Sequence, residues 1–188
     1  MIKLLQEGMF LYHGSYCEVS EPDIGKCSPF KDFGRGFYLT TERSQAEQFA
    51  KLSSRKALEN GLIPASQNFG VVSVFKFHVS GQTEILVYPE ADEKWLHCIV
   101  AHRKERIFKD VRYDSAKYDI IGGKIANDAT NATILTYMSG AFGEVGSKEA
   151  DEICIRLLLP ERLQDQYAFR TGKALNQLEF LRSGRIWI

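Results

Sequence analysis

The sequence lacks an excess of charge of either sign, and it lacks any apolar run long enough to cross a membrane. Lysine plus arginine and aspartate plus glutamate number 24 each, so the formal net charge is zero. A protein that coats nucleic acid needs an excess of cations, although a local patch could still hold a small nucleic-acid target. Gln6 and Glu7 interrupt the short apolar stretch at the N-terminus, which does not resemble a signal peptide. These absences predict a cytoplasmic protein with no membrane contact.

Cysteines are few, and none of them occurs in a metal-binding pattern. The four are Cys17, Cys27, Cys98 and Cys154. No two form a CxxC, and His97 beside Cys98 lacks the second paired ligand that is typical of a zinc site. Scattered thiols fit a reducing compartment. They predict neither a disulfide framework nor a bound metal.

Repeats, low-complexity stretches and Pro/Gly-rich linkers are absent as well. Hydrophobic residues make up 44% of the chain and charged residues 26%, as in ordinary globular proteins. A chain of 188 residues can bury a sizeable core. We therefore predict one domain over residues 1–188.

Short strands and helices are predicted along the whole chain. The strands fall at residues 9–13, 36–41, 71–79, 84–88, 118–126 (interrupted by a glycine pair) and 166–170. The helices run from Thr41 or Ser44 to Gly61 and over 92–108, 128–140, 148–159 and 173–181. Trp95, Trp187 and the phenylalanines are predicted to be core residues. This mixture predicts the α+β fold class.

Two segments carry residue types suited to ligand binding, LYHGS at 11–15 and DFGRGFYLTTERSQAEQFA at 32–50. Alone, each is weak, because a single histidine after a strand is more often structural. Glycines before an aromatic strand often mark only a tight turn or a close backbone approach. The two segments together form a more specific pattern than either does alone.

Together the two segments resemble the ADP-ribosyltransferase superfamily, in the histidine–tyrosine branch that includes diphtheria toxin and the poly(ADP-ribose) polymerases. That branch pairs a His-Gly-Ser/Thr strand with a Gly-x-Gly-x-Tyr strand and a helix that begins with a Ser-Ala-like pair. The matching residues are His13-Gly14-Ser15, Gly34-Arg35-Gly36-Phe37-Tyr38 and Ser44-Gln45-Ala46. The resemblance implies the fold of that superfamily, a split β-sheet core of short strands with flanking helices.

The wider pattern is similar to a bacterial family catalogued as a domain of unknown function within this superfamily. Its members share an early YHG, a DFGxGFYxT segment and three further segments. The corresponding parts of this chain are residues 12–14, 32–40, 95–103, 119–128 and 166–175. The similarity therefore extends over nearly the whole chain.

The resemblance implies NAD as the substrate and assigns roles to individual residues. His13 is expected to bond the adenosine ribose, and the backbone of Gly14 to pair with the nicotinamide carboxamide, which Ser44 also reaches. Tyr38 is expected to stack on one face of the nicotinamide ring, and Phe49 is expected on the opposite face of that ring. Ser15, Gly36 and Phe37 complete the expected NAD-binding set.

The third position of the motif departs from most active relatives, which carry a glutamate at the start of a late strand. Gln166 stands there, and an amide bonds ribose hydroxyls without bringing negative charge. Asp165 is expected on the opposite face of that strand. Glu179, in Gln177-Leu178-Glu179, imitates the Gln-x-Glu of arginine-specific toxins, but it lies in a predicted helix and lacks that branch's partners. The expected catalytic set is therefore His13, Tyr38 and Gln166.

By resemblance, the expected function is an NAD-dependent mono-ADP-ribosyltransferase that acts on an unknown protein or nucleic acid. Its transition state resembles that of glycoside cleavage. By analogy, it is a bacterial toxin or effector with a neutralising antitoxin partner. Because Gln166 stands in place of the glutamate, a non-catalytic NAD or ADP-ribose binding module is the alternative function. A plain NAD glycohydrolase is the third possibility.

Two charged groups are interpreted as structural. The basic stretch at 102–106, with Lys109 and Arg112, is read as a solvated helix face, with a surface that steers NAD phosphates as the alternative. The group Asp114, Asp119, Asn127 and Asp128 fits no calcium loop. Asn127 or Asp128 is expected to cap a helix instead.

Overall fold

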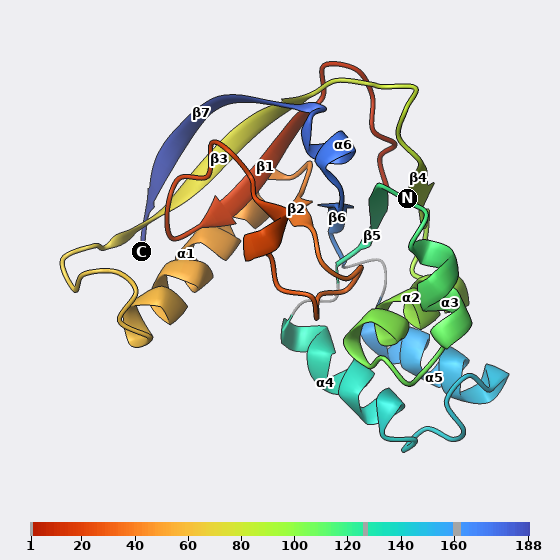
Figure 1. Ribbon diagram of the computed structural model, residues 1–188. Helices are drawn as coiled ribbons and strands as arrows, with labels where there is room; N and C mark the ends of the chain where they lie inside the picture. The colour runs from red at the N-terminus through yellow and green to blue at the C-terminus, as the bar shows by residue number, and fades with distance from the viewer. Residues whose placement is uncertain (1, 126–127, 160–162) are drawn as a thin grey trace.

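A computed structural model describes residues 2–125, 128–159 and 163–188. In this part of the chain, six α-helices and two sheets form a mixed α+β fold (Figure 1). The strands are β1 (Phe10–Ser15), β2 (Phe37–Leu39), β3 (Phe69–Phe77), β4 (Ile85–Val87), β5 (Ile120–Lys124), β6 (Asp165–Phe169) and β7 (Leu178–Trp187). The helices are α1 (Arg43–Glu59), α2 (Glu93–Arg103), α3 (Lys109–Ser115), α4 (Asp128–Met138), α5 (Lys148–Leu158) and α6 (Gly172–Leu175).

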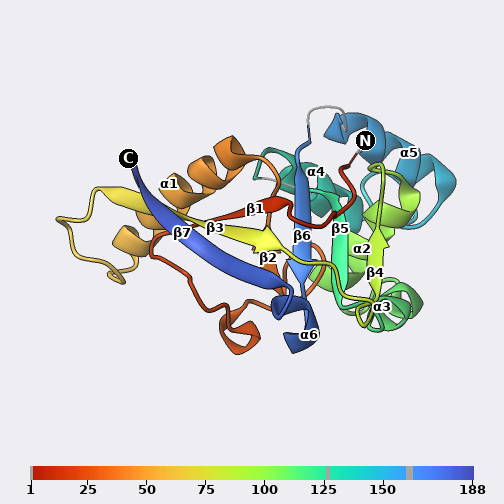
Figure 2. The same ribbon diagram turned by 90° about the horizontal axis from the view of Figure 1, so that it is seen from above.

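The two sheets lie next to each other and meet at a single pair of residues. One sheet has the order β1-β3-β7 and the other β2-β6-β5-β4, in which only β4 and β5 pair in parallel (Figure 2). Tyr12 of β1 exchanges two main-chain hydrogen bonds with Thr40, which follows β2, at 2.8 and 3.0 Å. Beyond this bridge β1 and β2 do not pair.

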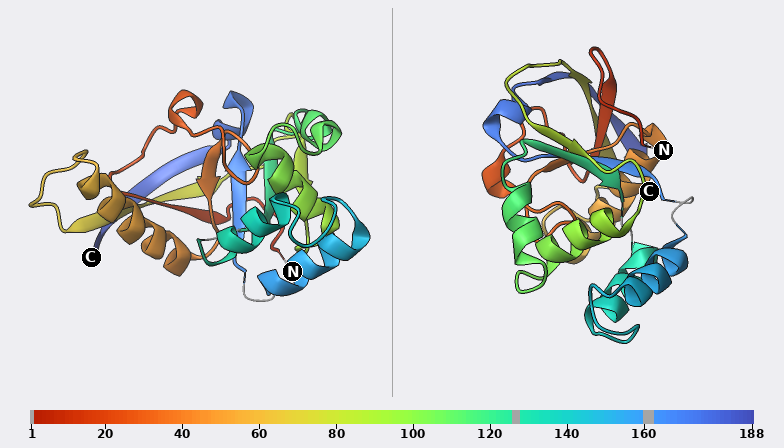
Figure 3. Two further views of the ribbon diagram at one scale, coloured as in Figure 1. Left: turned by 90° about the horizontal axis from the view of Figure 1, so that it is seen from below. Right: turned by 90° about the vertical axis from the view of Figure 1, so that its right-hand side faces the viewer.

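Helix α1 covers one face of the three-stranded sheet, whereas α2 to α5 gather around the four-stranded sheet (Figure 3). The close approach of α1 requires glycine in two strands. A Cβ on Gly14 would lie 2.0 Å from the carbonyl oxygen of Ala46, and one on Gly70 would lie 2.4 Å from that of Ala50. Both alanines are buried. Small residues on both surfaces therefore set the distance between helix and sheet.

Most buried apolar residues belong to two clusters, and a third, small one lies where α1 packs on β3. The larger is built around Trp95, Leu96 and Ile99 of α2, which are fully buried, and the Trp95 indole donates to the carbonyl of Lys124 at 2.9 Å. The smaller core contains Leu11, Phe37, Phe75, Phe77, Tyr167 and Phe169. Trp95 thus confirms the core prediction, whereas Trp187 is 60% exposed at the end of β7, so that prediction is wrong. Several phenylalanines are also exposed, namely Phe10, Phe30 and Phe49.

The six predicted strands and the first four helices are present, with shifted ends. The helix predicted over 92–108 ends at Arg103, because the chain turns there, and Phe108 (φ 51°) stacks on His97 before α3 begins. The strand predicted with an interruption is continuous in β5, where Gly122 leaves room for the ring of Tyr167. Asn127 lies outside the described residues, so its role as a helix cap stays a prediction.

The helix predicted over 173–181 is wrong. Helix α6 stops at Leu175, and the chain continues as the ten-residue strand β7. Pairing with β3 overrides the local helical pattern, because it packs the half-buried Phe180 against Phe75, with ring centroids 5.6 Å apart.

In the described ranges, no helix has the length and apolar character needed to cross a membrane. The four cysteines are free thiols.

Candidate functional site

A cleft of about 920 Å³ lies along the edges of β1 and β2 beyond the Tyr12–Thr40 bridge. Its other walls come from α1, the loop before β2, and β6. It is lined by most of the residues predicted to bind NAD, namely His13, Gly14, Ser15, Gly36, Phe37, Tyr38, Phe49 and Gln166. The structure thus brings together segments that lie more than 150 residues apart in the sequence.

Ser44 is the predicted site residue that the structure does not bring to the cleft. It is exposed in the first turn of α1, and the following Gln45 and Ala46 line the cleft instead. Gln45 is held there by the hydroxyl of Thr40, which donates to its amide oxygen at 2.9 Å.

His13 spans the gap between the two strands. Its Nδ1 lies 2.8 Å from the carbonyl oxygen of Tyr38, which can only accept, so Nδ1 carries the proton. Burial lowers the pKa of His13 below its ordinary value of 6.5, so the ring is neutral at pH 7. The ring packs on Phe37, with centroids 4.4 Å apart. In this tautomer Nε2 is a hydrogen-bond acceptor in a residue that lines the cleft.

Gly14 offers main-chain groups to the same cleft. Tyr12 directs both its N–H and its C=O away from β3, toward Thr40. Because strand residues alternate, the N–H and C=O of Gly14 face the same edge, past the point where β2 separates from β1. A donor and an acceptor that lie side by side match the two hydrogen-bonding groups of a primary carboxamide.

Tyr38 uses its hydroxyl within the protein. The hydroxyl donates to the carbonyl of Gly34 at 2.8 Å and accepts from the main-chain N–H of Phe33 at 2.9 Å. Gly34 has φ +79°, a backbone conformation that favours glycine. Burial, with Asp32 nearby, raises the pKa of Tyr38 well above its usual value, so it stays a neutral phenol. Its ring, rather than its hydroxyl, is the part that suits a ligand.

Gln166 lines the cleft and belongs to a network of polar side chains. Its amide nitrogen donates to Asp32 Oδ2 at 2.7 Å. Asp32 Oδ1 accepts from Arg103 Nη2 at 2.5 Å and from Nε at 3.0 Å, while Arg103 Nη1 donates to Asn131 at 2.9 Å. Gln166 and Asp32 are 5% and 7% exposed. The network joins β6, the loop before β2, α2 and α4.

A family model described as a protein of unknown function, DUF3990, matches residues 9–180. The chain belongs to the DUF3990 family. Its matched range contains every cleft residue discussed above. No curated protein matches the chain. The site, rather than the family description, therefore has to carry any functional argument for this DUF3990 protein.

Sequence reasoning did not predict the roles of Asp32 and Arg103. The sequence predicts a solvated basic face over 102–106, but His102 is buried and the Arg103 side chain is only 15% exposed. Arg103 pairs with Asp32 across 71 residues of sequence. Lys104, Arg106 and Lys109 of that stretch are exposed, as predicted. A contact of such long range has no local periodicity, so no pattern within α2 distinguishes Arg103 from its neighbours.

The two alternative carboxylates of this DUF3990 chain lie away from the cleft. Asp165 pairs with Lys124 at 2.8 Å and does not line the cleft, as predicted from strand alternation. Glu179 belongs to β7 rather than to a helix, and its carboxylate bonds His78 at 2.8 Å. It does not line the cleft either, so the similarity to arginine-specific toxins has no support.

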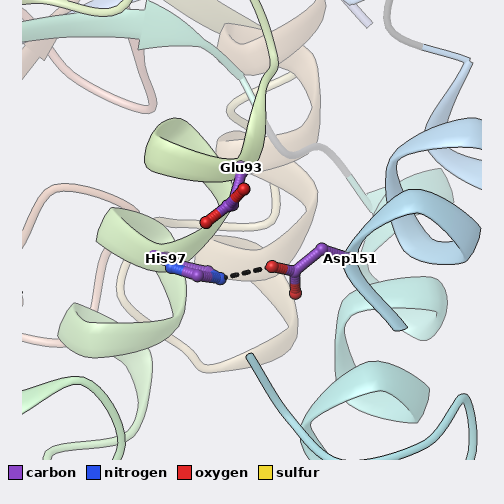
Figure 4. A group of neighbouring side chains, drawn as sticks. All are labelled: Glu93, His97 and Asp151. Carbon is purple, nitrogen blue, oxygen red and sulfur yellow. Dashed lines mark hydrogen bonds and ion pairs between the residues drawn. The ribbon is translucent and has the colours of Figure 1, made fainter. Parts of the chain in front are cut away.

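A second polar group, formed by Glu93, His97 and Asp151, lies between α2 and α5 (Figure 4). His97 Nε2 donates to Asp151 Oδ2 at 2.7 Å, and the hydroxyl of Tyr137 donates to the other oxygen of Asp151. Asp151 is 2% exposed. His97 and Asp151 therefore bond each other and join α2 to α5, so we assign the group to packing rather than to metal binding.

Proposed function

We propose that this protein is an NAD-dependent mono-ADP-ribosyltransferase of the histidine–tyrosine branch. The carrying observation is that His13, the free edge of Gly14, Tyr38 and Gln166 line one cleft, as that resemblance requires. Two sheets that meet at one bridge and then separate also agree with the split sheet expected of the fold.

The charges around the cleft suit a dinucleotide. Among the described residues that line it, Lys31, Lys56 and Arg103 are cationic and Asp32 is the single carboxylate. A concave surface with excess positive charge attracts the diphosphate of NAD. The volume of about 920 Å³ is at the upper end of the range for small-molecule sites, which is roughly 300–1,000 Å³.

His13, Gly14 and two aromatic side chains of the cleft each match a part of NAD. His13 Nε2 accepts from a ribose hydroxyl, because Nδ1 is already committed to Tyr38. The N–H and C=O of Gly14 pair with the nicotinamide carboxamide, and the ring of Tyr38 contributes a face for the nicotinamide. Phe49, which is 38% exposed, gives a second apolar surface from α1.

In the proposed reaction, the bond between the nicotinamide nitrogen and the ribose anomeric carbon breaks, and nicotinamide leaves as a neutral molecule with the bonding electrons. Positive charge develops on the sugar, as in glycoside cleavage. A nucleophile of the acceptor attacks the anomeric carbon and releases its proton to solvent. The amide oxygen of Gln166 accepts from a hydroxyl of the same ribose. The protein's contribution is orientation together with electrostatic stabilisation.

A binding module without catalysis is the second candidate, and one observation favours it. The carboxylate of Asp32 is already paired with Arg103, so the local charge near Gln166 is largely neutralised. Such a site would hold NAD or ADP-ribose without strongly favouring the transition state over the substrate.

The test is incubation with NAD that is labelled in its adenylate part, with protein and nucleic-acid mixtures as acceptors. Label on a macromolecule together with released nicotinamide, both abolished by His13→Ala, supports the transferase. His78→Ala, at an exposed histidine outside the cleft, is the matched control and should behave as wild type. Free ADP-ribose without labelled macromolecule indicates a glycohydrolase, binding without turnover indicates the module, and no binding refutes the proposal.

A cytoplasmic location, a toxin or effector role and an antitoxin partner stay predictions from the sequence and from analogy. Identifying the labelled acceptor in the same experiment shows which cellular component is modified, and so tests the location and the toxin or effector role.

A further inference from the structure

Asp32 lines the cleft but takes no direct part in the proposed reaction. It is the one carboxylate among the described lining residues, and it is buried next to Gln166, where active relatives carry a glutamate. Its two oxygens have separate partners, Gln166 at Oδ2 and Arg103 at Oδ1. A carboxylate, paired with Arg103, thus lies one hydrogen bond away from position 166.

The contact with Asp32 fixes which way the Gln166 amide faces. A carboxylate paired with arginine accepts hydrogen bonds and donates none, so the amide must turn its nitrogen toward Asp32. The amide oxygen then faces away from Asp32 and is the group left for a bound molecule. A charge-assisted bond on the nitrogen side also polarises the amide, which increases the negative charge on its oxygen.

Arg103 and Asn131 hold this arrangement from behind. Arg103 of α2 donates to Asp32 through two nitrogens and to Asn131 of α4 through a third. Rotation of the Asp32 carboxylate would therefore break its bonds to Arg103. Four segments of the chain therefore converge to orient one amide.

We propose that Asp32 is a positioning residue that orients and polarises Gln166, so that the Asp32–Gln166 pair replaces the single glutamate of active relatives at the nicotinamide ribose. The inference rests on the proposed function, but the pair can also be tested without NAD. Its direct consequence is that a glutamate at 166 is harmful while Asp32 is present. Two carboxylates at the observed separation of 2.7 Å cannot both ionise.

The experiment compares Asp32→Asn, Gln166→Glu and the double variant D32N/Q166E, which keeps one carboxylate and one amide but exchanges their places. Asp165→Asn is the matched control, since Asp165 precedes Gln166 in β6, is 8% exposed and lies outside the cleft. Nicotinamide release gives kcat and an NAD titration gives Kd. Circular dichroism confirms that each variant is folded.

We expect Asp32→Asn to lower kcat roughly tenfold to a hundredfold with little change in the Kd of NAD, because orientation acts mainly on the reacting geometry. Gln166→Glu should also lose activity at pH 7, and the double variant should regain activity relative to both single variants. Asp165→Asn should keep the wild-type kcat. A folded Asp32→Asn with wild-type kcat, or a Gln166→Glu that gains activity while Asp32 is present, would overturn the inference.

A stability measurement keeps failure of this inference distinct from failure of the proposed function. In Gln166→Glu, the shared proton raises the pKa of the carboxyl pair above the unfolded value, so stability should fall as the pH rises from 4 toward 8, by comparison with wild type. The double variant should not show this added loss. If Gln166→Glu shows none, the pair is refuted even where NAD binds. If the loss appears but wild type neither binds nor cleaves NAD, the proposed function fails instead, and with it the catalytic role of Asp32.

Discussion

The cleft and the α2–α5 group contain similar residue types but differ in which atoms remain available. In the α2–α5 group, Asp151 accepts from both His97 and Tyr137, and these contacts join α5 to α2 and to α4. In the cleft, His13 commits only Nδ1, and Gln166 commits only its amide nitrogen. The polar groups of the α2–α5 group bond one another and stabilise the fold, whereas the cleft residues keep hydrogen-bond acceptors that a ligand can reach.

This difference is a better guide to function than residue identity. A histidine beside a buried carboxylate attracts attention as a site, yet here it stabilises packing. A glutamine and a strand edge attract little attention, yet they line the cleft of about 920 Å³. The predictions below separate an effect on stability from an effect on binding.

The largest expected effect is on the wall of the cleft. Gly14→Ala places a Cβ 2.0 Å from a main-chain oxygen of α1, which cannot move without displacing the helix. We expect the free energy of unfolding to fall by about 3 kcal/mol, with loss of NAD binding, as measured by urea unfolding and titration. Gly184→Ala is the control on the same sheet, because nothing lies within 4 Å of the added Cβ. Equal stability of the two variants would show that α1 does not pack on Gly14 as described.

The next largest effect is on stability, when a substitution disrupts the α2–α5 group. Asp151→Ala removes the acceptor shared by His97 and Tyr137, and we expect unfolding to become easier by about 2 kcal/mol, the scale of hydrogen bonds to a charged group. NAD affinity should not change. Glu93→Ala, which removes the exposed member of the group, should alter neither quantity. A loss of NAD affinity in Asp151→Ala would contradict the assignment of this region to packing.

A smaller effect concerns the pH dependence of stability, because the pKa values of two histidines shift in opposite directions. Burial lowers the pKa of His13, so the unfolded chain binds its proton more readily and stability is lost as the pH falls below about 6.5. Bonds to Glu179 and Glu7 raise the pKa of His78, so its contribution is present at low pH and is lost as the pH rises through the raised value.

Urea unfolding of His13→Gln and His78→Gln between pH 5 and 8 measures both contributions. His13→Gln should lose less stability than wild type on acidification. His78→Gln should be less stable than wild type at low pH and equal to it at high pH. Curves parallel to wild type in both variants would refute the assigned environments.

Much of the fold follows from local patterns, and the site follows only in part. Elements such as β1, β3 and α1 are predictable because the residue types that favour them are neighbours in the sequence. The sequence predicts a helix over the first residues of β7 and no element after residue 181, because the partner strand β3 lies about a hundred residues earlier. His13, Tyr38 and Gln166 were found through motifs, but Ser44 faces solvent, since one residue along a helix rotates the side chain by about 100°. Asp32 and Arg103 required the folded chain.

Titration of NAD into the wild-type protein and into His13→Ala by calorimetry tests the central claim most directly. Wild type should bind NAD at one site, and His13→Ala should bind at least roughly tenfold more weakly, a loss of about 1.4 kcal/mol, while His78→Ala retains the wild-type affinity. Absence of binding to wild type, or equal affinities of wild type and His13→Ala, would contradict the claim that this cleft binds NAD.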